Sequence, residues 1–554
     1  MAREQRSISM GIRSMVALVA TLCALASPAA AKQARDESDA FFRKGEIPAI
    51  RLEIADDMVE ALRRDPRAYA RCTLHADGAV ASAAAGVKLK GAAGSFQGFD
   101  ERPAFTVDVD RFGESPRFKG LEKFHLNNSV QDPSLLSEWT CAAILREAGY
   151  PHTRVTHARL VVNGRDLGVY VLKESFDEHF LARNFKDASG NLYDGGFCQD
   201  IDAELELDEG DEASARAELR ALADACRDPD MQRRWDAIER LVDVPQFVRF
   251  MALEAMLGHW DGYSYNSNNY RLYFEGKPAP KAGAIPRSGP KARFLLHGMD
   301  QCFQDPAATV LDMPRGMLAS SVMKNPAWRK EYRRQVERLL ADFSAKRLLP
   351  ALEEVEARVG RAMRAFDAAA AEEQGARARE FVERVVAREQ SLRAQAKAPE
   401  PKPLDLKPGR ERTIDGWHPM SEVEDALVEV AEGQGGRWYR VKCGPAGRCI
   451  AGFRRGVLLS RGRYRLEAIV RTEAVGALAE EGQPCTGAGV RISGLACGEA
   501  AVESGERALA FEFEVAEETA DVELVLELRA SRGEAAFRAG SVKLAMLPPK
   551  RMVQ

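Results

Sequence analysis

A proline-rich segment divides this 554-residue chain into two parts with different hydrophobic patterns. The segment, AKAPEPKPLDLKPGRE at residues 396–411, combines closely spaced prolines with charged side chains. A stretch of this composition is stiff and solvated, and it can join neither of the hydrophobic cores beside it. We therefore predict an interdomain linker at residues 396–411, in a chain that is too long for one ordinary core.

The hydrophobic period changes across this linker. Before it, residues 344–366 and 376–395 repeat apolar side chains at helical spacing, which predicts two amphipathic helices that pair antiparallel. After it, segments such as GRYRLEAIVRT and DVELVLELRAS alternate apolar and polar residues between glycine-rich turns. This period of two, without a long helix, predicts an all-β domain of the β-sandwich type over residues 412–550.

The part before the linker begins with strand-like segments and ends with helical ones. In THARLVVNGRDLGVYVLKESFD, two such segments flank Asn163–Gly164, which predicts a hairpin turn. Further along, VPQFVRFMALEAMLGH has the pattern of a helix capped by Asp243. Strands followed by helices indicate an α+β domain over residues 45–395 rather than a doubly wound sheet.

The first 31 residues have a composition of their own. A basic start, a short apolar run and three alanines before Lys32 predict a secretory signal peptide that is cut after Ala31. The alternative is an uncleaved N-terminal anchor. No later segment has about 18 uninterrupted apolar residues, so we expect no membrane span after cleavage and an exported protein in the periplasm, at the cell surface or outside the cell. The formal charge of −4 gives no indication of nucleic-acid binding.

Cysteines and aromatic residues of the second part suggest further features. Export permits disulfides, and two local pairs are candidates, Cys443 with Cys449 and Cys485 with Cys497. Three aromatic residues of this part, namely Trp417, Trp438 and Tyr439, fit either a carbohydrate-binding surface or the core of the domain.

The stretch GHWDGYSYNSNNYRLYF, residues 258–274, contains the first candidate site. His259, Asp261 and Asn266 have the spacing H-x-D-x-x-x-x-N, which is that of the protein-kinase catalytic loop. In that chemistry the aspartate orients an acceptor hydroxyl and the amide oxygen binds a metal ion. The alternative is that Asn266, Asn268 and Asn269 are turn formers.

A second acidic residue follows 39 positions after the first. In ARFLLHGMDQCF an apolar, strand-like run ends in a short turn that carries Asp300, and a carboxylate in such a position can bind a metal ion. A surface loop rich in proline, glycine and lysine separates the two motifs, so a returning hairpin would bring Asp261 and Asp300 together.

Basic residues on an upstream strand complete the candidate site. In GVKLKGAAGSF, Lys88 and Lys90 share one face of a strand, because side chains alternate with a period of two. A lysine in this position can neutralise phosphates when a glutamate holds it, and Glu174 is the candidate partner of Lys90.

Several motifs in their order along the chain resemble the CotH kinase family of spore-coat and other exported proteins. The resemblance covers residues 45–395 and rests on the segment from FKGLEKFHLNN to REAGYP, followed by RLVVNGRDLGVYVLKESFDEHFLARNF, GNLYDG, NNYRLY and HGMDQCF. It implies an atypical protein-kinase-like fold, ATP with Mg²⁺ or Mn²⁺, and phosphorylation of secreted proteins on serine or threonine. By this resemblance Asp261 and Asp300 match catalytic acids, and Lys90 and Glu174 match the strand-borne basic and acidic positions.

The chain departs from the family pattern at one position. The family turn often has the form D-x-D, and here the first acid is replaced by Gly298. Metal binding would then depend on Asp300 with Asn266 or water. Two hypotheses follow: an exported kinase that acts on extracytoplasmic or coat proteins, or an inactive kinase-like structural or adhesion protein that binds envelope or glycan partners.

Overall fold

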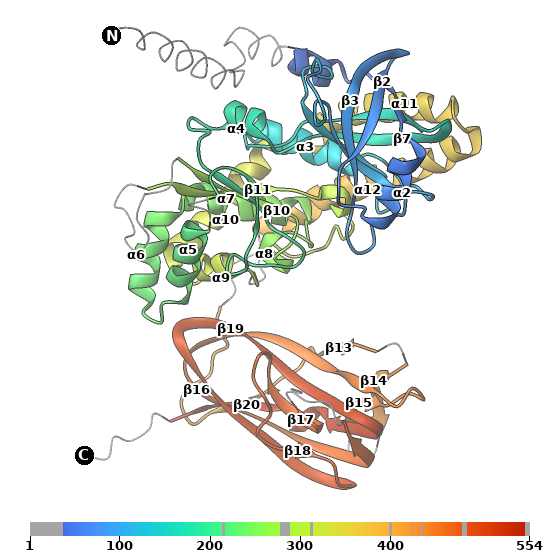
Figure 1. The fold of residues 1–554 in the computed structure, drawn as a ribbon. Helices are drawn as coiled ribbons and strands as arrows, with labels where there is room; N and C mark the ends of the chain where they lie inside the picture. Colours follow the sequence, from blue (N-terminus) through green and yellow to red (C-terminus); the bar gives the residue numbers. More distant parts are fainter. Residues whose placement is uncertain are drawn as a thin grey trace, which may run out of the picture. The chain divides into compact units, whose positions relative to one another are not determined.

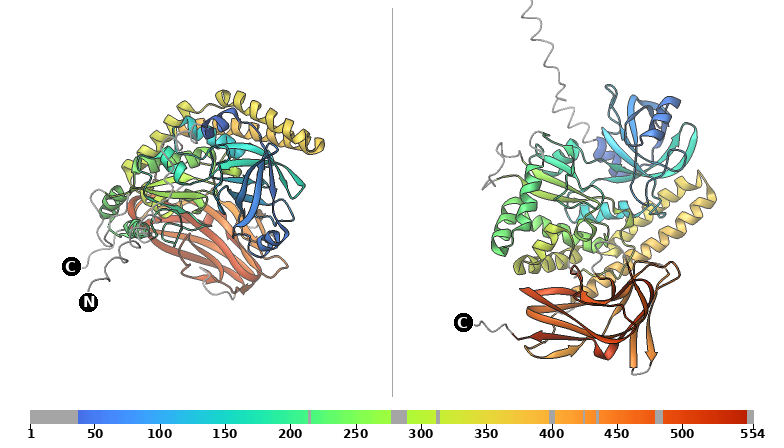
Figure 2. Two further views of the ribbon diagram at one scale, coloured as in Figure 1. Left: turned by 45° about the horizontal axis from the view of Figure 1, so that its top comes forward. Right: turned by 60° about the horizontal axis from the view of Figure 1, so that its bottom comes forward.

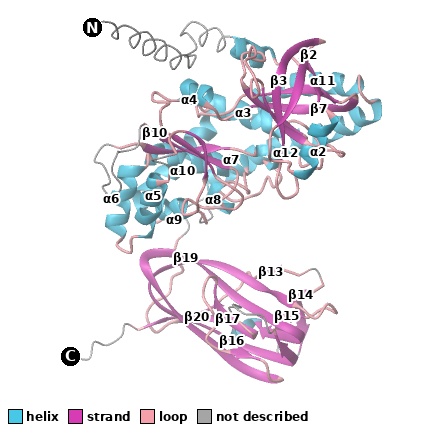
Figure 3. Cartoon of the chain, in the orientation of Figure 1, coloured by secondary structure: helices cyan, strands magenta, loops and turns pink. Residues whose placement is uncertain are grey.

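The computed structural model describes residues 37–212, 216–276, 289–310, 314–397, 402–423, 425–433, 436–478 and 485–548. Two compact units divide the chain, residues 1–398 and residues 399–554. The first unit is mixed α/β, and in the second almost all described elements are strands (Figures 1 and 3). The predicted signal peptide, residues 1–31, lies outside the described residues. Within the described part of the chain, no helix is both long and apolar enough to cross a membrane.

Seven strands of the first unit form a closed barrel in the order β1-β2-β3-β4-β5-β7-β6, which parallel pairing between β1 and β6 closes. The strands are β1 (Ala49–Glu53), β2 (Ala70–Ala76), β3 (Ala79–Lys90), β4 (Ala104–Asp108), β5 (Lys123–Asn127), β6 (Val155–Val162) and β7 (Arg165–Glu174). Asn163 and Gly164 turn the chain between β6 and β7 with φ of 47° and 79°, which confirms the predicted hairpin. Apolar side chains such as Phe105 and Leu172 fill the barrel interior.

A second sheet of the first unit has four strands in the order β11-β10-β8-β9. The strands are β8 (Asn191–Asp194), β9 (Glu206–Glu209), β10 (Tyr270–Glu275) and β11 (Lys291–Leu296). Strands β10 and β11 pair antiparallel, with Tyr270 opposite Leu296, so the segments that follow Asp261 and precede Asp300 run side by side. The returning hairpin expected from the sequence is therefore present.

Helices precede, interrupt and follow the strands of the first unit. They are α2 (Asp56–Arg64), α3 (Ser137–Glu147), α4 (Glu178–Asn184), α5 (Ala217–Arg227), α6 (Met231–Leu241), α7 (Val244–Leu257), α8 (Tyr263–Asn266), α9 (Met317–Met323), α10 (Pro326–Asp342), α11 (Ala345–Arg364) and α12 (Ala368–Lys397), with a 3₁₀ turn at Met299–Gln301. Helices α11 and α12 contact each other along their length, as the amphipathic patterns predicted (Figure 2).

Helix α7 begins and ends as the sequence predicts. The Asp243 carboxylate caps its first turn by accepting from Gln246 N, and Gly258 ends the helix with φ of 63°. A left-handed residue at this place is favourable for glycine, because a Cβ would be strained there. The buried side chains on almost every face of α7 make it the central helix of the unit.

In the second unit the strands form a nine-stranded sheet arrangement. They are β12 (Glu411–Thr413), β13 (His418–Ser421), β14 (Leu427–Gly433), β15 (Gly436–Lys442), β16 (Cys449–Ala477), β17 (Gly487–Ile492), β18 (Ala500–Ala501), β19 (Gly505–Arg538) and β20 (Lys543–Leu547). The long strands β16 and β19 supply most of the apolar core, with residues such as Leu466 and Leu526 fully buried.

The structure tests the predicted disulfides of the second unit and the two alternatives for its aromatic residues. Cys485 and Cys497 form a disulfide, as predicted, whereas Cys443 and Cys449 remain free thiols. The three aromatic side chains are buried. Trp417 and Tyr439 lie in the core, and the guanidinium groups of Arg471 and Arg538 both contact the ring of Trp438. They therefore form no exposed platform for a sugar.

Candidate active site

A cavity of about 840 Å³ lies between the barrel and the four-stranded sheet and contains most of the candidate residues. Lys90, Asp261, Asn266 and Asp300 line it, whereas Glu174 does not. Residues from segments far apart in the sequence, near positions 90, 261 and 300, therefore converge on one space. A cavity of this size is suitable for a nucleotide-sized ligand.

Strand register places a row of basic and polar residues on the barrel wall that faces the cavity. Lys88 lies opposite Thr106, Thr106 opposite His125, and His125 opposite Lys173, so these side chains share one face of strands β3, β4, β5 and β7. Lys90 is on the same face, two residues after Lys88. The adjacent row of Leu89, Phe105, Leu126 and Leu172 points into the barrel core.

Lys90 is a basic residue of this wall that lines the cavity. Its Nζ donates to the side-chain oxygen of Asn127 at 2.6 Å. Burial and, to a smaller extent, the positive charge of Lys173 lower the pKa of Lys90 to about 8. The amide of Asn127 carries no charge, so it does not neutralise the ammonium group of Lys90. An anionic ligand in the cavity can do so.

Lys173 and Glu138 form an ion pair that the sequence analysis missed. Lys173 Nζ lies 2.8 and 3.0 Å from the two carboxylate oxygens of Glu138, and both side chains are almost completely excluded from solvent. Glu138 is in the first turn of α3, so the pair joins the barrel to this helix. A lysine inside the apolar strand run GVYVLKE was the signal available in the sequence.

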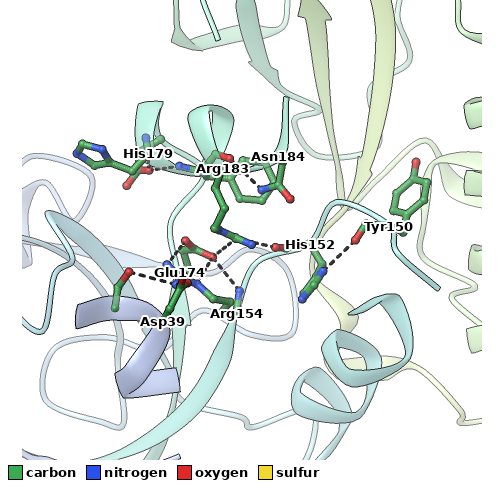
Figure 4. A network of polar contacts seen from close by, with 11 residues as sticks. Asp39, Tyr150, His152, Arg154, Glu174, His179, Arg183 and Asn184 are labelled. Carbon is green, nitrogen blue, oxygen red and sulfur yellow. Dashed lines mark hydrogen bonds and ion pairs between the residues drawn. The ribbon is translucent and has the colours of Figure 1, made fainter. Parts of the chain in front are cut away.

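Glu174 does not contact Lys90, and the expected pair between them is absent. Alternation along β7 turns Glu174 to the opposite face from Lys173, away from the cavity. Its carboxylate instead binds two arginines, Arg154 with Nη2 at 2.6 Å and Arg183 with Nη2 at 2.5 Å, and Arg154 also reaches Asp39 (Figure 4). These arginines hold the pKa of Glu174 below its usual range despite burial.

Asp261 is held by the three asparagines that follow it. The side-chain nitrogen of Asn266 donates to Oδ1 at 2.5 Å, and those of Asn268 and Asn269 donate to Oδ2 at 3.0 and 2.8 Å. The expectation that Asn268 and Asn269 only form a turn was incomplete. Asn269 does have a left-handed φ of 47°, but its side chain also fixes the carboxylate.

Asp300 lies in the 3₁₀ turn after β11 and faces the cavity. Burial and, to a smaller extent, the negative charge of Glu138 raise the pKa of Asp300 to about 6. The turn is attached to α3 because Ser137 Oγ donates to the carbonyl oxygen of Met299 at 2.6 Å. A cation beside Asp300 would relieve the cost of ionising this buried carboxylate.

Gly298 takes the place of an acid for a structural reason. Its φ of 55° is left-handed, and a Cβ at this position would lie 2.3 Å from Oδ1 of Asn269. The amide oxygen of Asn269 therefore occupies the space in which a side chain at position 298 would begin. An amide oxygen and the Asp300 carboxylate are both oxygen ligands of the kind that Mg²⁺ and Mn²⁺ prefer.

Two buried charged residues hold the Asp261 loop from behind. Arg388 of α12 donates to the carbonyl oxygens of Ala255 and Met256 at the end of α7, and to those of Pro306 and Ala308 after the Asp300 turn. It thus links the segments that carry both acids. The carboxylate of Glu254 accepts from Tyr263 N at 2.7 Å and Ser264 N at 3.1 Å, which fixes the start of α8, and burial raises its pKa to about 8.

Comparisons with known proteins agree with the motifs found in the sequence. Inner spore coat protein H of Bacillus subtilis (strain 168) is 27% identical over 180 residues, which are 30% of this chain and 49% of that protein. Spore coat protein homolog 1 of Rhizopus delemar is 25% identical over 169 residues, 27% of each chain. The chain thus spans about half the length of the first relative and about a quarter of the second.

Solved structures show more distant likenesses. The Helicobacter pylori proinflammatory kinase CtkA matches 50% of this chain and 93% of its own, with 9% identity and a TM-score of 0.25. TmCBM61, in complex with beta-1,4-galactotriose, matches 24% of this chain and 88% of its own, with 12% identity and a TM-score of 0.15. Neither score is high enough to assign a fold. The family model described as CotH kinase protein, however, matches residues 87–378, which are more than half of the sequence. This chain therefore belongs to the CotH kinase protein family.

Proposed function

We propose that this chain is an exported protein kinase that transfers the γ-phosphoryl group of ATP to serine or threonine hydroxyls of extracytoplasmic or coat proteins. The observation that carries the proposal is the convergence of Lys90, Glu138, Asp261 and Asp300 around one cavity, with the buried Lys173 paired to Glu138. The signal-like N-terminus and relatives named for the spore coat support export.

The basic wall of the cavity would bind the phosphates of the nucleotide. Lys90 and Lys173 present two ammonium groups on one face of the barrel, and Glu138 fixes the second of them. Glu174, which the sequence analysis assigned to this role, would instead stabilise the fold at the far side of β7. Fixed cations next to phosphate oxygens are the main means of catalysis in phosphoryl transfer, because charge accumulates there in the transition state.

The opposite wall would hold Mg²⁺ or Mn²⁺. Asp300 supplies a carboxylate, and Asn269 or Asn266 supplies an amide oxygen. When bound, the ion would neutralise charge on the β- and γ-phosphates. Asp300 and Asp261 belong to no preformed group of three acidic, histidine or cysteine ligands among the described residues. Phosphate and water oxygens would therefore have to complete the coordination.

Asp261 would orient the acceptor hydroxyl and accept its proton. The three asparagine amides fix both carboxylate oxygens, so the group is positioned before the acceptor arrives. As the new bond forms between the acceptor oxygen and the γ-phosphorus, the bond from that phosphorus to the β–γ bridging oxygen breaks. The hydroxyl proton moves to Asp261, and ADP leaves with the bond's electron pair.

Gly298 favours a second candidate function, an inactive kinase-like protein with a structural or adhesive role. With one acid in the turn instead of two, metal binding would be weaker. Of the glycan and envelope partners considered for this function, a glycan would have to bind elsewhere than at Trp417, Trp438 and Tyr439, which are buried.

Phosphate transfer from γ-labelled ATP tests the proposal. The full chain without residues 1–31 is incubated with Mg²⁺ or Mn²⁺ and a mixture of serine- and threonine-containing peptides. We expect the wild type to label the peptides, and labelling to fall at least 100-fold in Asp261→Asn and Asp300→Asn. The exposed control Asp342→Asn should label as well as the wild type. Equal labelling by wild type and both site variants would contradict catalysis in this cavity. A nucleotide-induced thermal shift without any transfer would favour the inactive candidate.

A further inference from the structure

Two aromatic side chains at the cavity remain largely exposed. Trp260 is 50% exposed and Phe197 is 56% exposed, and both line the cavity that contains Asp261. By contrast Tyr263 and Tyr270, close to Trp260 in the sequence, are fully buried. Exposed aromatic surface beside a cavity is typical of an interaction site, because such side chains supply much contact area at a low entropic cost.

Hydrogen bonds connect the segment of Phe197 to the residues that hold Asp261. The backbone N–H of Cys198 donates to Oδ1 of Asn268 at 3.4 Å, and Cys198 Sγ accepts from Nδ2 of Asn266 at 3.7 Å. The same two asparagines donate to Asp261. Phe197 is therefore held close to the carboxylate by a short chain of contacts.

Trp260 also lies next to the Asp261 carboxylate group's segment, because it is the residue directly before Asp261 in the chain. Apolar surface thus flanks the end of the cavity at which an acceptor hydroxyl would be bound. The wall that would bind phosphates presents lysine, histidine and asparagine side chains instead. The two ends of the cavity differ in chemistry, and the aromatic pair belongs to the acceptor end.

We propose that Trp260 and Phe197 bind an apolar side chain that neighbours the phosphoacceptor serine or threonine in a polypeptide substrate. The inference rests on the proposed kinase function and adds a substrate class to it. Consecutive residues of an extended peptide are about 3.3–3.6 Å apart, so a residue next to the acceptor would lie beside the two segments that carry these rings. Covering a ring with a leucine-sized side chain removes apolar area from water on both partners.

Matched peptides test this selectivity. Two peptides of equal length and charge carry one serine that is flanked either by leucine or by glycine, and kcat/KM for each is measured at saturating ATP. The enzymes are wild type, Trp260→Ala, Phe197→Ala and the double variant. The control is Phe366→Ala, since Phe366 is 38% exposed but does not line the cavity. Trp260→Phe tests whether another aromatic ring suffices.

We expect the wild type to prefer the leucine peptide by about tenfold, mainly through KM. Each alanine variant should lose most of this preference, while the control and Trp260→Phe keep it and the ATP-induced thermal shift stays unchanged in all. Equal use of both peptides by the wild type, a preference that survives in the double variant, or transfer to cellobiose instead of peptides would overturn the inference. Failure to label any peptide or sugar would overturn the proposed function, and this inference with it.

Discussion

The ammonium group of Lys173 lies 2.8 Å from a carboxylate oxygen of Glu138, and both side chains are buried between the barrel and α3. Removing one charge of a buried pair leaves the other without its partner and costs more stability than removing both. Glu138 also lines the cavity in which we propose that ATP binds, so the pair places a positive charge close behind that wall. Its removal therefore has separable effects on stability and on nucleotide binding.

Glu138→Gln leaves the buried Lys173 charge unpaired. We expect a loss of about 3–5 kcal/mol in the free energy of unfolding and weaker ATP binding. The double variant Glu138→Leu with Lys173→Met should recover most of the stability, because it removes both charges, but should not recover ATP binding. Urea unfolding and titration with ATP measure the two properties. Recovery of ATP binding in the double variant would contradict the role of Lys173.

The lowered pKa of Lys90 should make the free energy of unfolding depend on pH. Its pKa is about 8 in the folded protein and 10.5 without burial, so the unfolded chain binds the proton more tightly. Charged Lys90 thus destabilises the fold below pH 8, and this penalty disappears as the pH rises from 8 to 10.5. Lys90→Met should raise the free energy of unfolding by about 1–3 kcal/mol at pH 7 and by less at pH 10. Denaturation curves at both pH values, with exposed Lys346→Met as the control, test this expectation.

Gly298→Asp restores the family acid but should not improve the site. The new Cβ would meet Oδ1 of Asn269, and the backbone is left-handed at this position. We expect a lower melting temperature and no gain in metal affinity, and Gly298→Ala should show the same loss of stability without the charge. Stronger Mn²⁺ binding by Gly298→Asp at unchanged stability would show that the turn can adapt.

Arg388→Met removes the donor that joins the two acid-bearing segments. Four carbonyl oxygens would lose a charged donor, and those of Met256 and Pro306 would keep no other donor among the side chains described, so we expect a destabilisation of about 3–5 kcal/mol. Arg388→Lys keeps the charge and some of the donors and should recover part of this loss. Exposed Arg379→Met on the same helix is the control. A fully stable Arg388→Met variant would contradict the tether.

The grouping of Asp261 with Asp300 could be predicted because each acid stands at the end of a regular element. A helix with a clear cap and stop precedes Asp261, and an apolar strand precedes Asp300. The hairpin of β10 and β11 then brings the two together. Local patterns of this kind are strong signals because they depend on neighbours in the sequence.

The partners of the charged residues could not be predicted in the same way. Lys173 and Glu174 are adjacent, and only the register of β7 against β5 decides which of them faces the cavity. Likewise, Asn268 and Asn269 have the composition of a turn, and their bonds to Asp261 depend on the path of the chain after α8. The Arg388 contacts join residues 80 or more positions apart and leave no local pattern.

A crystal structure with Mn²⁺ and a non-hydrolysable ATP analogue tests the central claim most directly. We predict an anomalous Mn²⁺ peak about 2.2 Å from a carboxylate oxygen of Asp300, with the phosphates next to the ammonium groups of Lys90 and Lys173. Asp261 should remain free of the metal and face the γ-phosphate. A nucleotide bound outside this cavity, or no bound nucleotide and metal at millimolar concentrations, would contradict the account.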